Sequence, residues 1–206
     1  MKFEWRKQEK HLYLPDEKPA LITVSPQKFI MIGGKGNPNE EAFAERVGIL
    51  FSLSYAIRMM PKQGYVPEGY FEYTVYPLEG VWDLSDLGKQ SDSLDKNELV
   101  YRIMIRQPDF VMPDVFERAV DAVGRKSDPP LLKDVSFGTM EDGLSVQLLH
   151  IGPYDDEPRS FAMMKRFIGE NQLRLAARQH REIYLQDVRK TEKEKLKTVL
   201  RYRVEE

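Results

Sequence analysis

The sequence contains no cysteine, which excludes disulfide bonds, thiolate zinc sites and cysteine nucleophiles. Histidine is scarce, with only His11, His150 and His180. None of the three has the i, i+4 spacing of a helical metal site, so we expect no metal and no cofactor. Neither sign of charge dominates, with 31 basic and 33 acidic residues and a net charge of −2. This balance is unlike the basic face of a nucleic-acid-binding protein, so we expect no nucleic-acid partner.

Long hydrophobic runs are also missing, and none approaches the roughly 18 residues of a membrane span. The first residues, from Met1 to Lys7, are charged and lack the apolar core of a signal peptide. We therefore expect a cytoplasmic protein without a membrane partner. The chain nevertheless has 206 residues, of which 41% are hydrophobic, and this is enough to bury a sizeable core.

An order of elements that occurs twice is the most informative feature of the sequence. Each half predicts two strands, a Gly-Pro break, a helix and two further strands. In the first half the strands are expected at 20–24, 28–32, 70–78 and 99–107, with a helix capped by Asn37 and beginning at Pro38. In the second half they are expected at 134–137, 144–151, 181–187 and 197–204, with a hairpin turn at 141–143 and a helix after the acids 155–157.

These patterns predict an α+β fold in a single domain, residues 1–206. It would consist of duplicated β-β-α-β-β units with pseudo-two-fold symmetry. Repeat 1 would cover about 20–108, a connecting helix about 112–126, and repeat 2 about 131–204. Two antiparallel sheets, each backed by helices on one face, would form a central ligand cleft with their other faces.

Strand alternation predicts the character of that cleft. Between His180 and Gln186, the side chains of Ile183 and Leu185 point one way and can pack under a helix. The opposite set is His180, Glu182, Tyr184 and Gln186. From the first half, Tyr76, Tyr101 and Trp82 are expected near the same cleft. The pattern indicates aromatic walls around one acid, Glu182; the alternative is an ordinary sheet face with Glu182 in water.

Four segments resemble the gyrase-inhibitor-like (GyrI-like) small-molecule-binding superfamily. His150–Pro158 (HIGPYDDEP) resembles its H-x-G-P-Y-D-x-E-P segment, and Arg181–Asp187 with Lys195–Thr198 resembles its E-I-Y-L-x-D … K-L-x-T segment. Phe29–Pro38 is similar to the opening of its stand-alone members, and Pro77–Trp82 (PLEGVW) to their P-L-E-G-x-W segment. The resemblance covers roughly Leu21 to Val204.

The resemblance implies a duplicated α/β fold with a ligand cleft and an acid matching Glu182 in the pocket. Members fused to DNA-binding helices sense lipophilic, often cationic drugs. Some stand-alone members similar to this chain hydrolyse the cyclopropane of DNA-alkylating natural products with a pocket glutamate and tyrosine. The strands begin near Leu21, which leaves no room for a DNA-binding domain, so we do not expect a transcription factor.

The expected chemistry centres on Glu182, because a carboxylate in an apolar pocket can act as a base near neutral pH. Tyr184, Tyr76 or Tyr101 could donate a hydrogen bond to the ketone oxygen of the substrate. Trp82, Phe71 and Tyr55 are candidates to stack on a flat substrate.

The same residues also fit a protein that only binds a lipophilic cation. A third possibility is an inhibitor that binds another macromolecule. The expected partner is a hydrophobic aromatic small molecule, and the expected state is a monomer or a homodimer. We expect His150 to be a structural histidine.

Overall fold

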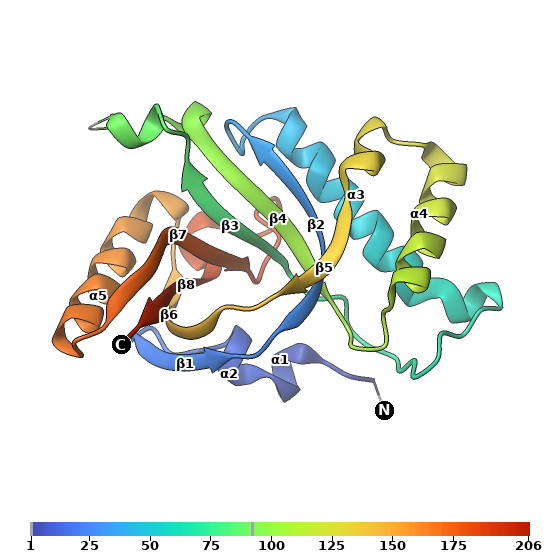
Figure 1. Ribbon diagram of the computed structural model, residues 1–206, viewed down its shortest axis with the longest axis horizontal. Coiled ribbons are helices and arrows are strands. Elements are labelled where there is room, and N and C mark those ends of the chain that lie inside the picture. Colours follow the sequence, from blue (N-terminus) through green and yellow to red (C-terminus); the bar gives the residue numbers. More distant parts are fainter. Residues whose placement is uncertain (1, 92) are drawn as a thin grey trace. The chain divides into compact units, whose positions relative to one another are not determined.

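The computed structural model describes residues 2–91 and 93–206 as an α+β protein (Figure 1). Its strands are β1 (Ala20–Val24), β2 (Gln27–Lys35), β3 (Leu78–Leu84), β4 (Leu99–Gln107), β5 (Ser136–Met140), β6 (Gly143–Ile151), β7 (Arg174–Tyr184) and β8 (Lys197–Glu205). Its α-helices are α1 (Trp5–Gln8), α2 (Lys10–Tyr13), α3 (Glu41–Met59), α4 (Pro113–Ser127) and α5 (Glu157–Glu170). The predicted α+β class with antiparallel strands is therefore confirmed.

The contacts within the chain divide it into two compact units. The first unit contains Gln27–Leu78 and Leu84–Met140, together with the first residues up to Glu4. The second contains Trp5–Pro26, Glu79–Asp83 and Glu141–Glu206. The strand β1 thus belongs to the second unit, whereas the predicted repeat 1 begins with it. The duplication and its symmetry stay predictions.

In the first unit, β2 pairs antiparallel with β4 on one side and β5 on the other. Helices α3 and α4 pack beside each other, and α3 also contacts β2 and β4. Ile30, Ile32, Leu53 and Ile105 are completely or almost completely buried in this core. Burying each such side chain contributes about 1.5–3 kcal/mol.

In the second unit the strand order is β1-β6-β8-β7-β3. Figure 1 shows α5 running along the sheet formed by β6, β7 and β8. A cluster of buried side chains joins the helix to the sheet. Its members are Val146, Leu148, Met164, Ile168, Leu200, Tyr202 and Val204.

Two strand predictions are wrong because pairing in this fold joins distant segments. The turn at 141–143 does not close a hairpin: β5 pairs with β2, whereas β6 pairs with β1 and β8. The segment 70–77 is not a strand apart from a bridge between Tyr73 and Phe3, and the strand begins only at Leu78. Aromatic packing of Tyr73 on Phe71 and Phe110 replaces the pairing expected there.

The predicted start of the first long helix is also wrong. Asn37 accepts a hydrogen bond from the backbone N–H of Asn39 at 3.0 Å, and α3 begins four residues after Asn37, at Glu41. The side chain therefore closes a local turn instead of capping the helix. The connecting helix at about 112–126 is confirmed by α4.

Candidate functional site

The strand β7 places His180, Glu182 and Tyr184 on one face of the second unit's sheet. His180 lies opposite Tyr202 and Glu182 lies opposite Leu200 on β8. Tyr202 and Leu200 belong to the cluster under α5, so this helix covers the face that carries Glu182. The predicted alternation is confirmed. The expectation that the helix covers the opposite face, with Ile183 and Leu185, is wrong for α5.

Glu182 is the end point of a chain of hydrogen-bond donors. The indole N–H of Trp82 donates to the Tyr184 hydroxyl at 2.8 Å, and this hydroxyl donates to Glu182 Oε2 at 2.7 Å. His180 Nε2 lies 2.8 Å from Glu182 Oε1. Because an ionised carboxylate only accepts, the geometry assigns the imidazole proton to Nε2. Both oxygens of Glu182 therefore have a donor.

Aromatic rings of the same unit pack against the two residues that donate hydrogen bonds to this carboxylate. The Tyr154 ring lies edge-on to Tyr184, with centroids 5.9 Å apart. The Phe161 ring lies edge-on to His180 at 4.7 Å. The side chain of Glu182 is 12% exposed, so the carboxylate keeps some contact with solvent.

A second carboxylate, Glu157, belongs to the same constellation. It is the first residue of α5 and only 6% exposed, and its Oε1 has no hydrogen-bond partner among the described residues. Burial, and then the charges of Glu182 and Asp155, raises the pKa of Glu157 to about 9. At neutral pH, Glu157 is therefore neutral.

The tyrosines next to the two carboxyl groups titrate abnormally for the same physical reasons. Burial raises the pKa of Tyr154 to about 12, with further contributions from the charges of Glu157 and Glu182. Burial, and then the charge of Glu182 and the hydrogen bond to it, raises the pKa of Tyr184 well above its ordinary value. Both hydroxyls thus remain protonated donors across the physiological range.

Gly80 explains how Trp82 reaches the site. The two residues share a face of β3, and a Cβ at position 80 would lie 2.6 Å from the indole nitrogen. No side chain larger than hydrogen fits there without moving the ring. This gives the P-L-E-G-x-W segment a structural reason, because its glycine leaves space for the tryptophan that contacts Tyr184.

A buried ionic network supports the opposite face of the same strands. Arg181 pairs with Glu79 at 2.8 Å and with Asp142 at 2.6 Å, while Arg201 pairs with Asp142 at 2.9 Å. Burial alone would raise the pKa of Asp142, but the two arginines hold it below its ordinary value. The network ties β3, β7 and β8 to the turn before β6. Of these strands, β3 carries Trp82, and β7 carries Glu182 and Tyr184.

The other sequence-based candidates lie in the first unit. Tyr101 is buried against Phe43, with its ring over Gly34. Tyr76 is buried under the guanidinium of Arg106, 4.7 Å from the ring centroid. Tyr55 and Phe71 are exposed. The structure thus brings Glu182, Tyr184 and Trp82 together, and a contribution of the first-unit aromatics to the same site stays a prediction.

Three residues that lie around Glu182 are absent from the sequence-based candidates for catalysis or binding: His180, Tyr154 and Glu157. His180 was visible as the neighbour of Glu182 on one strand face. Tyr154 and Glu157 stand in the H-x-G-P-Y-D-x-E-P segment, but the pattern there indicates only that the acids 155–157 precede a helix. His150 has both ring nitrogens occupied, by Ser160 Oγ at 2.9 Å and the Pro153 carbonyl at 3.1 Å, so the expected structural role is confirmed.

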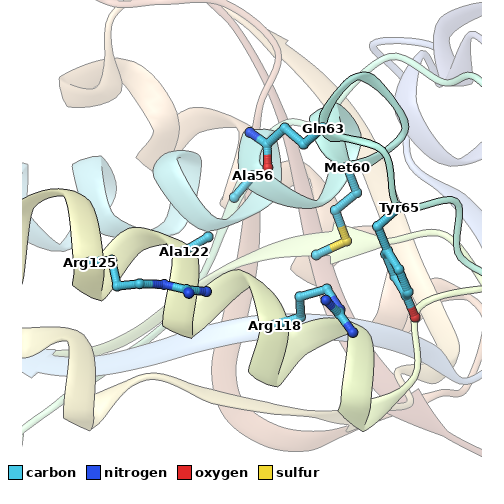
Figure 2. Close-up of a pocket in the computed structure, with 7 residues that line it drawn as sticks. All are labelled: Ala56, Met60, Gln63, Tyr65, Arg118, Ala122 and Arg125. Carbon is cyan, nitrogen blue, oxygen red and sulfur yellow. The ribbon is translucent and has the colours of Figure 1, made fainter.

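A small cavity in the first unit is a weaker candidate. It measures about 120 Å³ and lies between α3 and α4, and Figure 2 shows Arg118 and Arg125 of α4 on one side of it. The Arg118 guanidinium stacks over Tyr65 at 3.9 Å. The lining contains no carboxyl, hydroxyl nucleophile or imidazole apart from the Tyr65 phenol, so we place the reactive chemistry at Glu182. The remaining lining residues are Ala56, Met60, Gln63 and Ala122.

Two further features are missing from the part of the chain that the structure describes. Within 2–91 and 93–206, no three His, Asp or Glu side chains are grouped to hold a metal ion. No helix in those ranges is long and apolar enough to cross a bilayer.

Comparison with known proteins identifies the family. The sequence matches the GyrI-like small molecule binding domain over residues 17–204. Two crystal structures of hydrolases from Listeria innocua are 34% and 36% identical, each with a TM-score of 0.89, and cover 99% and 100% of this chain and 100% of their own. An uncharacterized conserved protein from Listeria innocua is 36% identical, with a TM-score of 0.91 over 99% of this chain and 100% of its own. No curated protein matches. The chain therefore belongs to the GyrI-like small-molecule-binding family.

Proposed function

We propose that the Glu182 site binds flat, hydrophobic, aromatic molecules and hydrolyses the cyclopropane of DNA-alkylating natural products, which would protect the cell from them. The observation that carries this proposal is a partly exposed carboxyl group that accepts hydrogen bonds from a tyrosine and a histidine whose rings pack against other aromatic rings. The two full-length relatives described as hydrolases support the reaction class.

The reaction adds one water to a cyclopropane that is conjugated to a dienone. The water oxygen bonds to a cyclopropane carbon, the strained C–C bond breaks, and its electron pair flows into the dienone to give a phenolate. The site must take one proton from the water, and the phenolate oxygen gains one. Glu182 supplies the negative charge that makes the site basic. Tyr184 positions this carboxylate, and its rotatable hydroxyl is the nearest candidate donor to the substrate oxygen.

A second function, binding or sequestering a lipophilic cation without turnover, has its own support. Glu182 accepts hydrogen bonds from Tyr184 and His180, and the rings of these two residues pack against Tyr154 and Phe161. Carboxylates and aromatic faces together attract organic cations. This function needs only the charge of the site and no activated water.

Mass spectrometry after incubation with a cyclopropane-bearing DNA alkylator tests the two functions. We expect the wild type to add one water to the compound, and we expect Glu182→Gln to add none while its circular dichroism is unchanged. Glu141→Gln, which changes an exposed acid of the second unit, is the matched control and should react like the wild type. If the compound co-purifies with the wild type unchanged, hydrolysis is refuted and the binding function is supported.

A further inference from the structure

His180 brings to the site a ring nitrogen, Nδ1, that is available to accept a proton. Its Nε2–H is used by Glu182 at 2.8 Å. The other nitrogen, Nδ1, has no hydrogen bond with any residue in 2–91 or 93–206. Nδ1 is not among the polar atoms that are both fully buried and unpartnered. Since the His180 side chain is also 22% exposed, this nitrogen has contact with solvent.

The surroundings hold the imidazole in this orientation. Its ring packs edge-on against Phe161 at 4.7 Å and lies 6.1 Å from Tyr202, while Glu182 fixes the edge that carries Nε2. The charged group that faces the ring is thus a carboxylate. A carboxylate bonded to one imidazole nitrogen fixes the tautomer and stabilises the imidazolium that forms when the other nitrogen takes a proton.

We propose that Glu182 and His180 form a carboxylate–imidazole dyad in which His180 Nδ1 takes the proton from the attacking water. The water O–H bond breaks, its proton moves to Nδ1, and the hydroxyl oxygen bonds to the substrate carbon. The imidazolium then gives a proton to the phenolate, directly or through solvent, which returns the dyad to its starting state. Glu182 keeps its charge throughout and acts through His180.

This inference rests on the proposed hydrolysis and assigns the proton transfer within it. It also accounts for the occupied state of Glu182, whose two oxygens already accept hydrogen bonds from His180 and Tyr184. Nδ1 of His180, by contrast, makes no hydrogen bond within 2–91 and 93–206, and the His180 side chain is 22% exposed.

Nitrogen-15 NMR of the imidazoles tests the dyad without any substrate. We expect His180 to be in the Nε2–H tautomer in the wild type and to lose this preference in Glu182→Gln. His180→Phe assigns the signal by its disappearance. His150 is an internal reference, because the Pro153 carbonyl requires a proton on its Nε2. An Nδ1–H tautomer for His180 in the wild type would overturn the inference.

Steady-state kinetics tests the proton transfer. We expect His180→Phe, which keeps the ring contacts, to lower kcat by about 10²- to 10⁴-fold with little change in KM. Added imidazole should restore part of the activity of His180→Ala. The control His11→Gln, at an exposed position, should behave like the wild type. Full activity of His180→Phe beside an active wild type would overturn the inference and leave the hydrolysis standing. A wild type that hydrates nothing would refute the hydrolysis and, with it, the proton transfer to Nδ1; the Nε2–H tautomer would then report only the hydrogen bond between His180 and Glu182.

Discussion

Replacing Glu157 by glutamine should stabilise the protein, and the gain should grow with pH. The carboxyl group of Glu157 has an ordinary pKa of 4.5, which burial and the charge of Glu182 raise to about 9 in the folded chain. The folded state therefore holds a proton that the unfolded state releases above pH 4.5. Since the folded state binds more protons, the free energy of unfolding falls as pH rises from about 4.5 to about 9.

The magnitude follows from the size of the pKa shift. Between pH 4.5 and pH 7 the cost accumulates over two and a half pH units, at about 1.36 kcal/mol each, which gives about 3 kcal/mol. Glutamine has nearly the same shape and cannot ionise, so Glu157→Gln should recover most of this free energy. For a chain of this size, that corresponds to a rise in Tm of about 6–12 °C at pH 7.

Urea unfolding of both proteins between pH 5 and pH 8 is the assay. The difference in unfolding free energy between Glu157→Gln and the wild type should be small at pH 5 and should increase steadily toward pH 8. Glu141→Gln, at an exposed acid, should show no such trend. In Glu182→Gln the trend should weaken, because one cause of the raised pKa is then absent. If the difference in unfolding free energy between Glu157→Gln and the wild type were the same at every pH, the assigned protonation state of Glu157 would be refuted.

Gly80→Ala should displace the Trp82 indole and break its hydrogen bond to Tyr184. We expect the unfolding free energy to fall by about 1–3 kcal/mol in urea titrations, and the tryptophan fluorescence to shift. Tyr184→Phe should leave the Trp82 N–H without its acceptor and the Glu182 carboxylate without one donor. The hydration rate in the mass-spectrometric assay should therefore fall about tenfold or more, while the circular dichroism stays unchanged. Arg181→Met should leave Glu79 as an uncompensated buried charge and cost about 3–5 kcal/mol in urea unfolding.

Local patterns predicted the elements whose causes are local. The strands at 20–24 and 99–107 have the predicted bounds, because β-branched and aromatic residues alternate there between clear breaks. The helix α4 begins at Pro113, where proline fits the first turn. The grouping of His180, Glu182 and Tyr184 on one face followed from the two-residue period of a strand.

The errors concern partners that alternation cannot reveal. A strand pattern does not say which distant strand it will meet, so the pairing of β5 with β2 was not predictable from the turn between β5 and β6. Alternation also does not say which face a helix will cover, and α5 lies over the acid rather than over Ile183. For the same reason the proximity of Glu157 to Glu182 could not be inferred, since it depends on how α5 docks.

The pairing of β1 with β6 has a consequence for the order in which the chain is made. Ala20 pairs with Gln147, and β6 begins only at Gly143. At about 5–20 residues per second, β1 leaves the ribosome on the order of ten seconds before its partner strand is synthesised. During that delay the nascent chain carries an apolar strand, with Leu21 and Ile22, whose edge is unpaired. Newly made chains are thus open at this point to chaperones and to strand exchange with another copy.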